Sequence, residues 1–146
     1  MASVIEEKVI AAAPEDVWAA LRDFGAVHVR LAPGFVVDAH LDGDRARVVT
    51  FAGGAIAREV LVGVDDDARR LSYSVVEGPL GASHHNASAQ AFAGPGGTTR
   101  FVWITDVLPD GLGEPVRQMM QQRIAVIAAT LESAADEAAT RVATTT

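Results

Sequence analysis

The sequence predicts an α+β fold in which an antiparallel sheet curves around one long C-terminal helix. Over residues 114–142, apolar residues recur at steps of three and four and so share one helix face: Val116, Met119, Met120, Ile124, Ile127, Leu131, Ala134, Ala135 and Ala138. Upstream of this stretch, short alternating segments are separated by turn residues. Because an apolar helix stripe needs a surface to cover, the strands must provide that surface.

The chain begins with a predicted strand followed by a short helical segment. Residues 3–11 alternate, with Val4 and Ile10 on one strand face and Ile5 and Val9 on the other. The period then changes to that of a helix that Pro14 opens and Gly25 ends, with an apolar stripe of Val17, Trp18, Leu21 and Phe24. Residues 26–34 form an irregular turn or a second short helix.

Six further strands are predicted before the long helix, at residues 35–41, 45–51, 55–64, 70–77, 84–92 and 99–108. In the first of them, strict alternation places Phe35, Val37, Ala39 and Leu41 opposite Val36, Asp38 and His40. The connections are short and contain the turn formers glycine, proline and aspartate, so consecutive strands must pair antiparallel. The long helix then starts near Glu114, with Pro115 in its first turn.

Composition limits the classes of protein that the chain can belong to. Of 146 residues, 49% are hydrophobic and 21% are charged, which is typical of a globular protein, and no apolar run approaches the roughly 20 residues of a membrane span. We expect one domain over residues 1–142, with residues 143–146 frayed. The net charge of −7 disfavours nucleic acid as a partner, and without cysteine there is neither a disulfide nor a thiolate site. No secretion signal is recognisable, so a cytoplasmic protein that does not insert into membranes is expected.

Several motifs, in order, resemble a known superfamily over about residues 4–131. They are AAAPEDVWAALRDFG at residues 11–25, APGF at 32–35, the spaced Arg47, Gly54 and Glu59, then Asp65 with RRLSYSVVEGPL at 69–80, and GTTRFVW followed by VLP within 97–109. The chain is similar to helix-grip (SRPBCC) proteins, which include the birch-pollen allergen, START domains and bacterial polyketide cyclase/dehydrase proteins. The resemblance implies a seven-stranded antiparallel sheet that grips the long helix around a cavity for a hydrophobic or amphipathic ligand.

His85 is the candidate for chemistry in this cavity. The alternation of residues 84–92 puts Ala87, Ala89 and Ala91 on the inward face, and His85 belongs to the same face. A histidine among alanines on a concave apolar surface can hydrogen-bond a ligand or exchange a proton with it. It can equally be a buried histidine satisfied by a neighbouring polar group. Similar family members often carry a tyrosine at about this place, so His85 is a departure from the pattern.

Arg47 and Glu59 flank Gly53 symmetrically, six residues on either side. If the hairpin is symmetric about this glycine, the two side chains face each other and can pair on the inward side of the sheet. Such a pair could anchor a polar group of a ligand, but a structural ion pair is the favoured interpretation.

The remaining candidates are apolar or lie near the expected cavity mouth. Tyr73 and Trp103 share inward strand faces and either line the pocket or belong to the core. Met119 and Met120 start the helix stripe near the mouth. Arg123 beside it either reaches into the cavity as a ligand contact or extends outward, and the outward direction is favoured.

His28 follows the first helix, in a segment that borders the cavity entrance in the family. A cluster of His28, His85 and Glu59 lacks the close spacing of a metal site, so neither a metal nor another cofactor is expected.

The favoured function is therefore binding of a small lipid-, polyketide- or isoprenoid-like molecule by a monomeric or homodimeric carrier or sensor. The alternative is an enzyme of the polyketide cyclase/dehydratase kind, in which His85 transfers protons together with Tyr73 or the Arg47 and Glu59 pair. Binding is preferred because acid–base catalysis normally needs two convergent titratable groups, and the sequence places one. A protein-interaction domain with a vestigial cavity is a third, weaker hypothesis.

Overall fold

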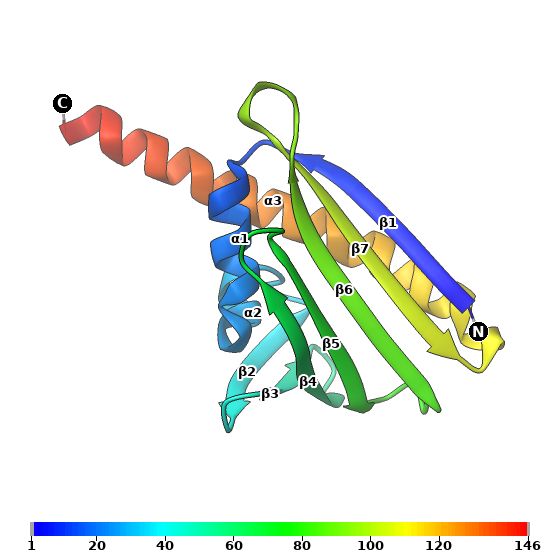
Figure 1. Ribbon diagram of the computed structural model, residues 1–146. Coiled ribbons are helices and arrows are strands. Elements are labelled where there is room, and N and C mark those ends of the chain that lie inside the picture. Colours follow the sequence, from blue (N-terminus) through cyan, green and yellow to red (C-terminus); the bar gives the residue numbers. More distant parts are fainter. Residues whose placement is uncertain (1, 146) are drawn as a thin grey trace.

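The computed structural model describes residues 2–145, and side chains for residues 2–142, as a helix-grip α+β fold (Figure 1). In chain order its elements are β1 (Ala2–Ile10), α1 (Pro14–Arg22), η1 (Phe24–Ala26), α2 (Val27–Arg30), β2 (Val36–Asp42), β3 (Ala46–Phe51), β4 (Ile56–Asp65), β5 (Arg70–Glu77), β6 (His84–Ala93), η2 (Pro95–Gly97), β7 (Thr99–Leu108), η3 (Asp110–Leu112) and α3 (Gly113–Thr145). Of the expected frayed end, residues 143–145 continue the α3 backbone, and residue 146 lies outside the described residues.

The strands within residues 2–108 form one seven-stranded sheet in the order β1-β7-β6-β5-β4-β3-β2, with every neighbouring pair antiparallel. Consecutive strands from β2 to β7 are neighbours, as their short turns predict. The connection from β1 to β2 passes instead from one edge of the sheet to the other through α1, η1 and α2. α1 packs on β5 and β6 while α2 packs on β2, so these short helices cover part of the same sheet.

Register shifts interrupt the sheet where it curves. One lies between Val36 and Asp38 on β2, and two more interrupt the pairing of β4 with β5. A bulge adds an unpaired residue and increases local bend and twist. It also reverses which side chains point inward, so Val36 is 4% exposed while Val37 is 56% exposed. The expected strict alternation of β2 is therefore wrong at its start.

The core lies between the concave face of the sheet and α3. The helix buries Val116, Met120, Ile124, Ile127, Ala128 and Leu131. Opposite them, Val4 and Ile10 on β1 and Phe101 on β7 are also buried, so the apolar stripe covers the sheet as predicted. The stripe ends earlier than expected, because Ala134 and Ala138 are exposed. Figure 1 gives the reason: the C-terminal part of α3 extends past the sheet.

Polar contacts attach the first helix to the loop that follows β4. The Trp18 ring is buried, and its indole N–H donates a hydrogen bond to Asp66 Oδ1 at 3.0 Å. Arg22 Nε donates to the same oxygen at 2.7 Å. Asp66 follows β4, so these bonds fix α1 over the middle of the sheet. No helix within the described residues combines the length and apolar character needed to cross a membrane.

Candidate functional site

An open hollow of about 410 Å³ lies between residues 33–35, Phe51, Ala52 and α3, where Arg123 and Val126 line it. Two further hollows lie between the sheet and α3. The larger one, called the outer cavity here, has a volume of about 400 Å³. Strand ends, the segment that connects β5 to β6 and the first half of α3 form its wall: Phe51, Ala57, Glu59, Val75, Val76, Glu77, Gly78, Pro79, Leu80, Gly81, Ala82, His85, Met119 and Arg123. Residues 77–79 and Gly81 are exposed, so this connection forms the mouth.

The smaller hollow, called the inner pocket here, has a volume of about 70 Å³ and lies beneath α1 and α2. Its lining is Leu21, Val27, Leu31, Ala32, Val36, Arg47, Val49, Phe51, Glu59, Leu71, Tyr73, Ala89, Phe101, Trp103, Arg123 and Ile127. Phe51, Glu59 and Arg123 line both hollows. These three side chains therefore separate the inner pocket from the outer cavity.

The expected pairing of Arg47 with Glu59 is confirmed. The two residues are register partners of β3 and β4, and Arg47 Nε donates to Glu59 Oε1 at 2.7 Å. Arg47 Nη1 donates to the Phe24 carbonyl at 3.1 Å, and the guanidinium lies 3.9 Å from the centre of the Phe24 ring. Gly53 and Gly54 make this register possible, since their φ values of +103° and +96° allow a tight turn. Both charges of the pair are buried and both are compensated.

Arg123 points inward, contrary to the expectation that it extends into water. Its guanidinium lies 4.5 Å from the centre of the Phe51 ring, and its Nε is buried without a hydrogen-bond partner among the described residues. Burial lowers the pKa of Arg123, although Tyr73 and Glu59 oppose this effect. The side chain stays cationic at neutral pH, because an arginine does not lose its proton in proteins. The outward expectation fails because Phe51, at the end of β3, covers the flank of the helix.

His85 lies on the inward face of β6 and lines the outer cavity, half-buried. Burial lowers the pKa of its imidazole; Glu59 opposes this effect, and the positive charge of Arg123 adds to it. The ring is therefore neutral at physiological pH, with one nitrogen able to donate a hydrogen bond and the other able to accept one.

The pH dependence of stability tests this environment. The pKa of a histidine in an unfolded chain is about 6.5, and the pKa of folded His85 is lower. As the pH falls below about 6.5, the unfolded chain therefore binds this proton before the folded chain does. Stability should therefore fall as the pH decreases from 7.5 to 5.5. In His85→Gln this contribution is absent, and urea unfolding should give a smaller loss over the same interval. Equal losses in the two proteins would contradict the buried, neutral state of His85.

Tyr73 belongs to the inner pocket rather than the outer cavity. Burial, together with the charge of Glu59, raises the pKa of its hydroxyl to about 12, although the positive charge of Arg47 acts to lower this pKa. An acid that weak is poorly matched to proton transfer at neutral pH. The hydroxyl is therefore suited to hydrogen bonding.

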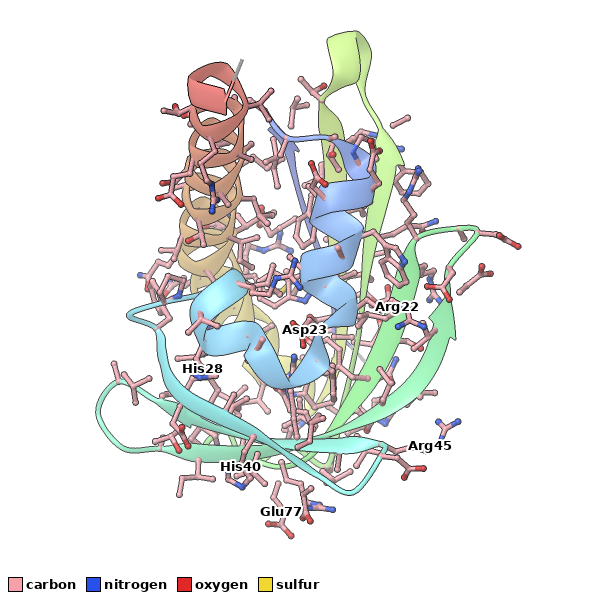
Figure 2. The ribbon with its side chains drawn as sticks, turned by 90° about the vertical axis from the view of Figure 1, so that its left-hand side faces the viewer. Arg22, Asp23, His28, His40, Arg45 and Glu77 are labelled. Atoms are coloured by element: carbon pink, nitrogen blue, oxygen red, sulfur yellow. The ribbon has the colours of Figure 1, made fainter. Side chains whose placement is uncertain are left out.

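The other predicted residues separate into three groups. Met119 lines the outer cavity, and Trp103 lines the inner pocket. Met120 and Ala87 are buried in the core and line neither hollow. His28 also lines neither; Figure 2 shows it on α2, separated in that view from Glu77 at the mouth of the outer cavity. Among the described residues, no three His, Asp or Glu side chains are grouped closely enough to hold a metal ion.

The sequence reasoning missed Phe51 and the connection at residues 78–82. Phe51 ends a strand directly before the glycine turn, a position that by itself gives no sign of a role in a site. The connection contains Gly78, Pro79 and Gly81 and was interpreted as a break between strands. Its apolar Leu80, set between turn residues, is the signal that it covers a hollow.

Comparison with solved structures identifies the class of fold. XoxI from Bacillus cereus superimposes with a TM-score of 0.81 at 21% identity, covering 92% of this chain and 96% of that one. A START superfamily protein from Mycobacterium smegmatis gives 0.72 at 13% identity, covering 92% and 97%. A protein from Thermobifida fusca gives 0.74 at 26% identity, covering 90% and 91%. The chain therefore has the helix-grip fold of START-like proteins.

The sequence profile of one family matches residues 1–145. The chain belongs to the polyketide cyclase/dehydrase and lipid transport family. A comparison with curated proteins finds no match.

Proposed function

We propose that the protein binds a small hydrophobic or amphipathic molecule, lipid-, polyketide- or isoprenoid-like, in the outer cavity and acts as its carrier or sensor. The observation that carries the proposal is the outer cavity itself. Its volume of about 400 Å³ lies within the roughly 300–1,000 Å³ of small-molecule sites. The family's association with lipid transport supports the same conclusion. The proposal needs no cofactor, nucleic acid or membrane insertion, and suits a monomer or a homodimer.

The composition of the wall supports an amphipathic ligand. Ala57, Val75, Leu80 and Met119 offer apolar surface, with one flexible thioether that adapts to different shapes. His85, Glu59 and Arg123 supply the few polar groups that orient a ligand. Native mass spectrometry of the purified protein, followed by solvent extraction, should reveal a retained small molecule. A protein that retains nothing and binds no hydrophobic probe would overturn the proposal.

Filling the outer cavity should abolish binding without disturbing the fold. Ala82 is half-buried at the wall, so Ala82→Phe places an aromatic ring in the space that a ligand would occupy. We expect the neutral fluorescent probe N-phenyl-1-naphthylamine to bind this variant at least about tenfold more weakly, a loss of 1.4 kcal/mol. The control is Ala134→Phe, which adds the same ring at an exposed position of α3. Equal probe affinity in the two variants would place binding elsewhere.

A second candidate function is catalysis of the cyclase/dehydratase kind. The observation that favours it is that His85 and Glu59, two titratable groups, line the same cavity. Glu59 is already paired with Arg47, however, so His85 alone is available to take a proton from a substrate. His85→Gln distinguishes the two functions. A carrier should keep its affinity within a few fold, whereas an enzyme should lose turnover and still bind.

A further inference from the structure

The charges that line the outer cavity restrict the chemistry of its ligand. We propose that the ligand is an amphipathic acid whose anionic group pairs with Arg123 while its hydrocarbon part occupies the rest of the outer cavity. This inference rests on the proposed function, because it names the class of molecule that the same site takes.

The buried charges do not balance. Phe51, Glu59 and Arg123 form the partition between the two hollows, and Glu59 is its acid. Glu59 accepts a hydrogen bond from Arg47 at 2.7 Å. Arg47 is also bound to the Phe24 carbonyl, so this pair is complete. Arg123 has no ion-pair partner among the residues that the structure describes, and its buried Nε makes no hydrogen bond there. Among the buried or half-buried charges of the partition and its Arg47 partner, Arg123 is therefore the one without a counter-ion; the other acid of the wall, Glu77, is exposed at the mouth.

The aromatic and imidazole neighbours of Arg123 do not supply the missing counter-ion. The guanidinium lies 4.5 Å from the centre of the Phe51 ring and is attracted to its π face. The ring carries no charge, however, and offers no oxygen that could accept a hydrogen bond. Burial lowers the pKa of His85, so that ring adds no positive charge and provides no anion. Arg123 is half-buried, and its Nε is held out of water without an acceptor, which is unfavourable; pairing with an anion offsets that cost. A guanidinium binds a carboxylate through two parallel N–H bonds.

The shape of the site sets the orientation of the ligand. Arg123, Glu59 and Phe51 line the inner pocket as well as the outer cavity, so they stand at the inner end of the outer cavity. The mouth, at residues 77–81, lies at its other end. An acid that reaches Arg123 would therefore enter with its charged group first. Its chain would lie against Val75, Leu80 and Met119.

A matched pair of probes tests the inference in the full chain. Decanoate and decanol have the same length, and without a cation in the site decanol should bind more tightly, because a carboxylate is more costly to desolvate. We expect wild-type protein at pH 7.5 to release N-phenyl-1-naphthylamine to decanoate at a concentration at least about tenfold lower than to decanol. Arg123→Met should reverse this order, so that decanol releases the probe at the lower concentration. Arg123→Lys should keep part of the preference for decanoate, since it retains the charge.

The control is Arg117→Met, which removes an arginine of the same helix that lies outside both hollows and faces Glu6. It should keep the full preference for decanoate. Without ligand, Arg123→Met should unfold at an equal or higher urea concentration than wild type, because it removes an uncompensated buried charge.

The outcomes separate this inference from the proposed function. If wild-type protein binds the neutral probe but prefers decanol, or if Arg123→Met keeps the preference for decanoate, the acid is excluded and the binding function stands. If the neutral probe does not bind wild-type protein, the binding function fails and the acid falls with it.

Discussion

Glu59→Gln is expected to lower the free energy of unfolding by about 3–5 kcal/mol, because it leaves Arg47 charged and unpaired in the interior. The two side chains are only 8% and 10% exposed, so water cannot replace the lost carboxylate. The nearby Arg123 makes the loss larger, since Glu59 is the buried carboxylate at the partition between the hollows. Urea unfolding followed by far-UV circular dichroism measures the difference.

Two further variants make this result specific. The double variant Arg47→Met/Glu59→Leu removes both charges and should recover most of the lost stability, because buried pairs can be replaced by apolar side chains at little cost. Glu7→Gln breaks the exposed pair with Arg100 and should cost at most about 1 kcal/mol. If the double variant were as unstable as Glu59→Gln, the pair would stabilise the protein by more than the neutralisation of one buried charge by the other.

Met120→Ala should be the second large effect, with a loss of about 2–5 kcal/mol in the free energy of unfolding. Met120 is 0% exposed and packs between α3 and the sheet. Its removal leaves a void that the surrounding strands can fill only in part. Thermal and urea unfolding should both report the loss.

Met119→Ala is the matched control, because the same side chain is removed one position earlier on the same helix. Met119 is half-buried and faces a hollow that already exists, so the expected loss of stability is below about 1 kcal/mol. Its effect should instead be on the affinity for N-phenyl-1-naphthylamine. Similar losses of stability in the two variants would contradict the assignment of Met119 to the cavity wall and Met120 to the core.

Much of the fold could be predicted because local patterns determine it. β5 and β7 have the predicted limits, since turn-forming residues bound each of them in the sequence. The pairing of Arg47 with Glu59 was predictable for the same reason: a short glycine turn leaves the hairpin little choice of register. The long helix was visible from its period, although its apolar stripe continued in the sequence beyond the point where the sheet ends.

The errors arise where tertiary contacts decide. The bulge at Val36 has no sign in a run of alternating residues, because it depends on how the sheet edge meets α2. The direction of Arg123 depends on Phe51, which is distant in sequence and reaches the helix flank only in the folded protein. The same applies to the mouth of the outer cavity, whose residues resemble an ordinary loop until the sheet brings them over Met119.

The partition formed by Phe51, Glu59 and Arg123 has a consequence for how ligand preference can diverge among related chains. Because these three side chains border both hollows, a change at any of them alters two volumes, and a change at Glu59 or Arg123 alters the charge balance as well. His85 and Met119 border the outer cavity alone, and Tyr73 and Trp103 border the inner pocket alone. Substitutions at these four positions can therefore adjust the length and shape of the accepted molecule in one hollow at a time, whereas a change in the accepted ligand charge requires a substitution at the partition, which alters both hollows.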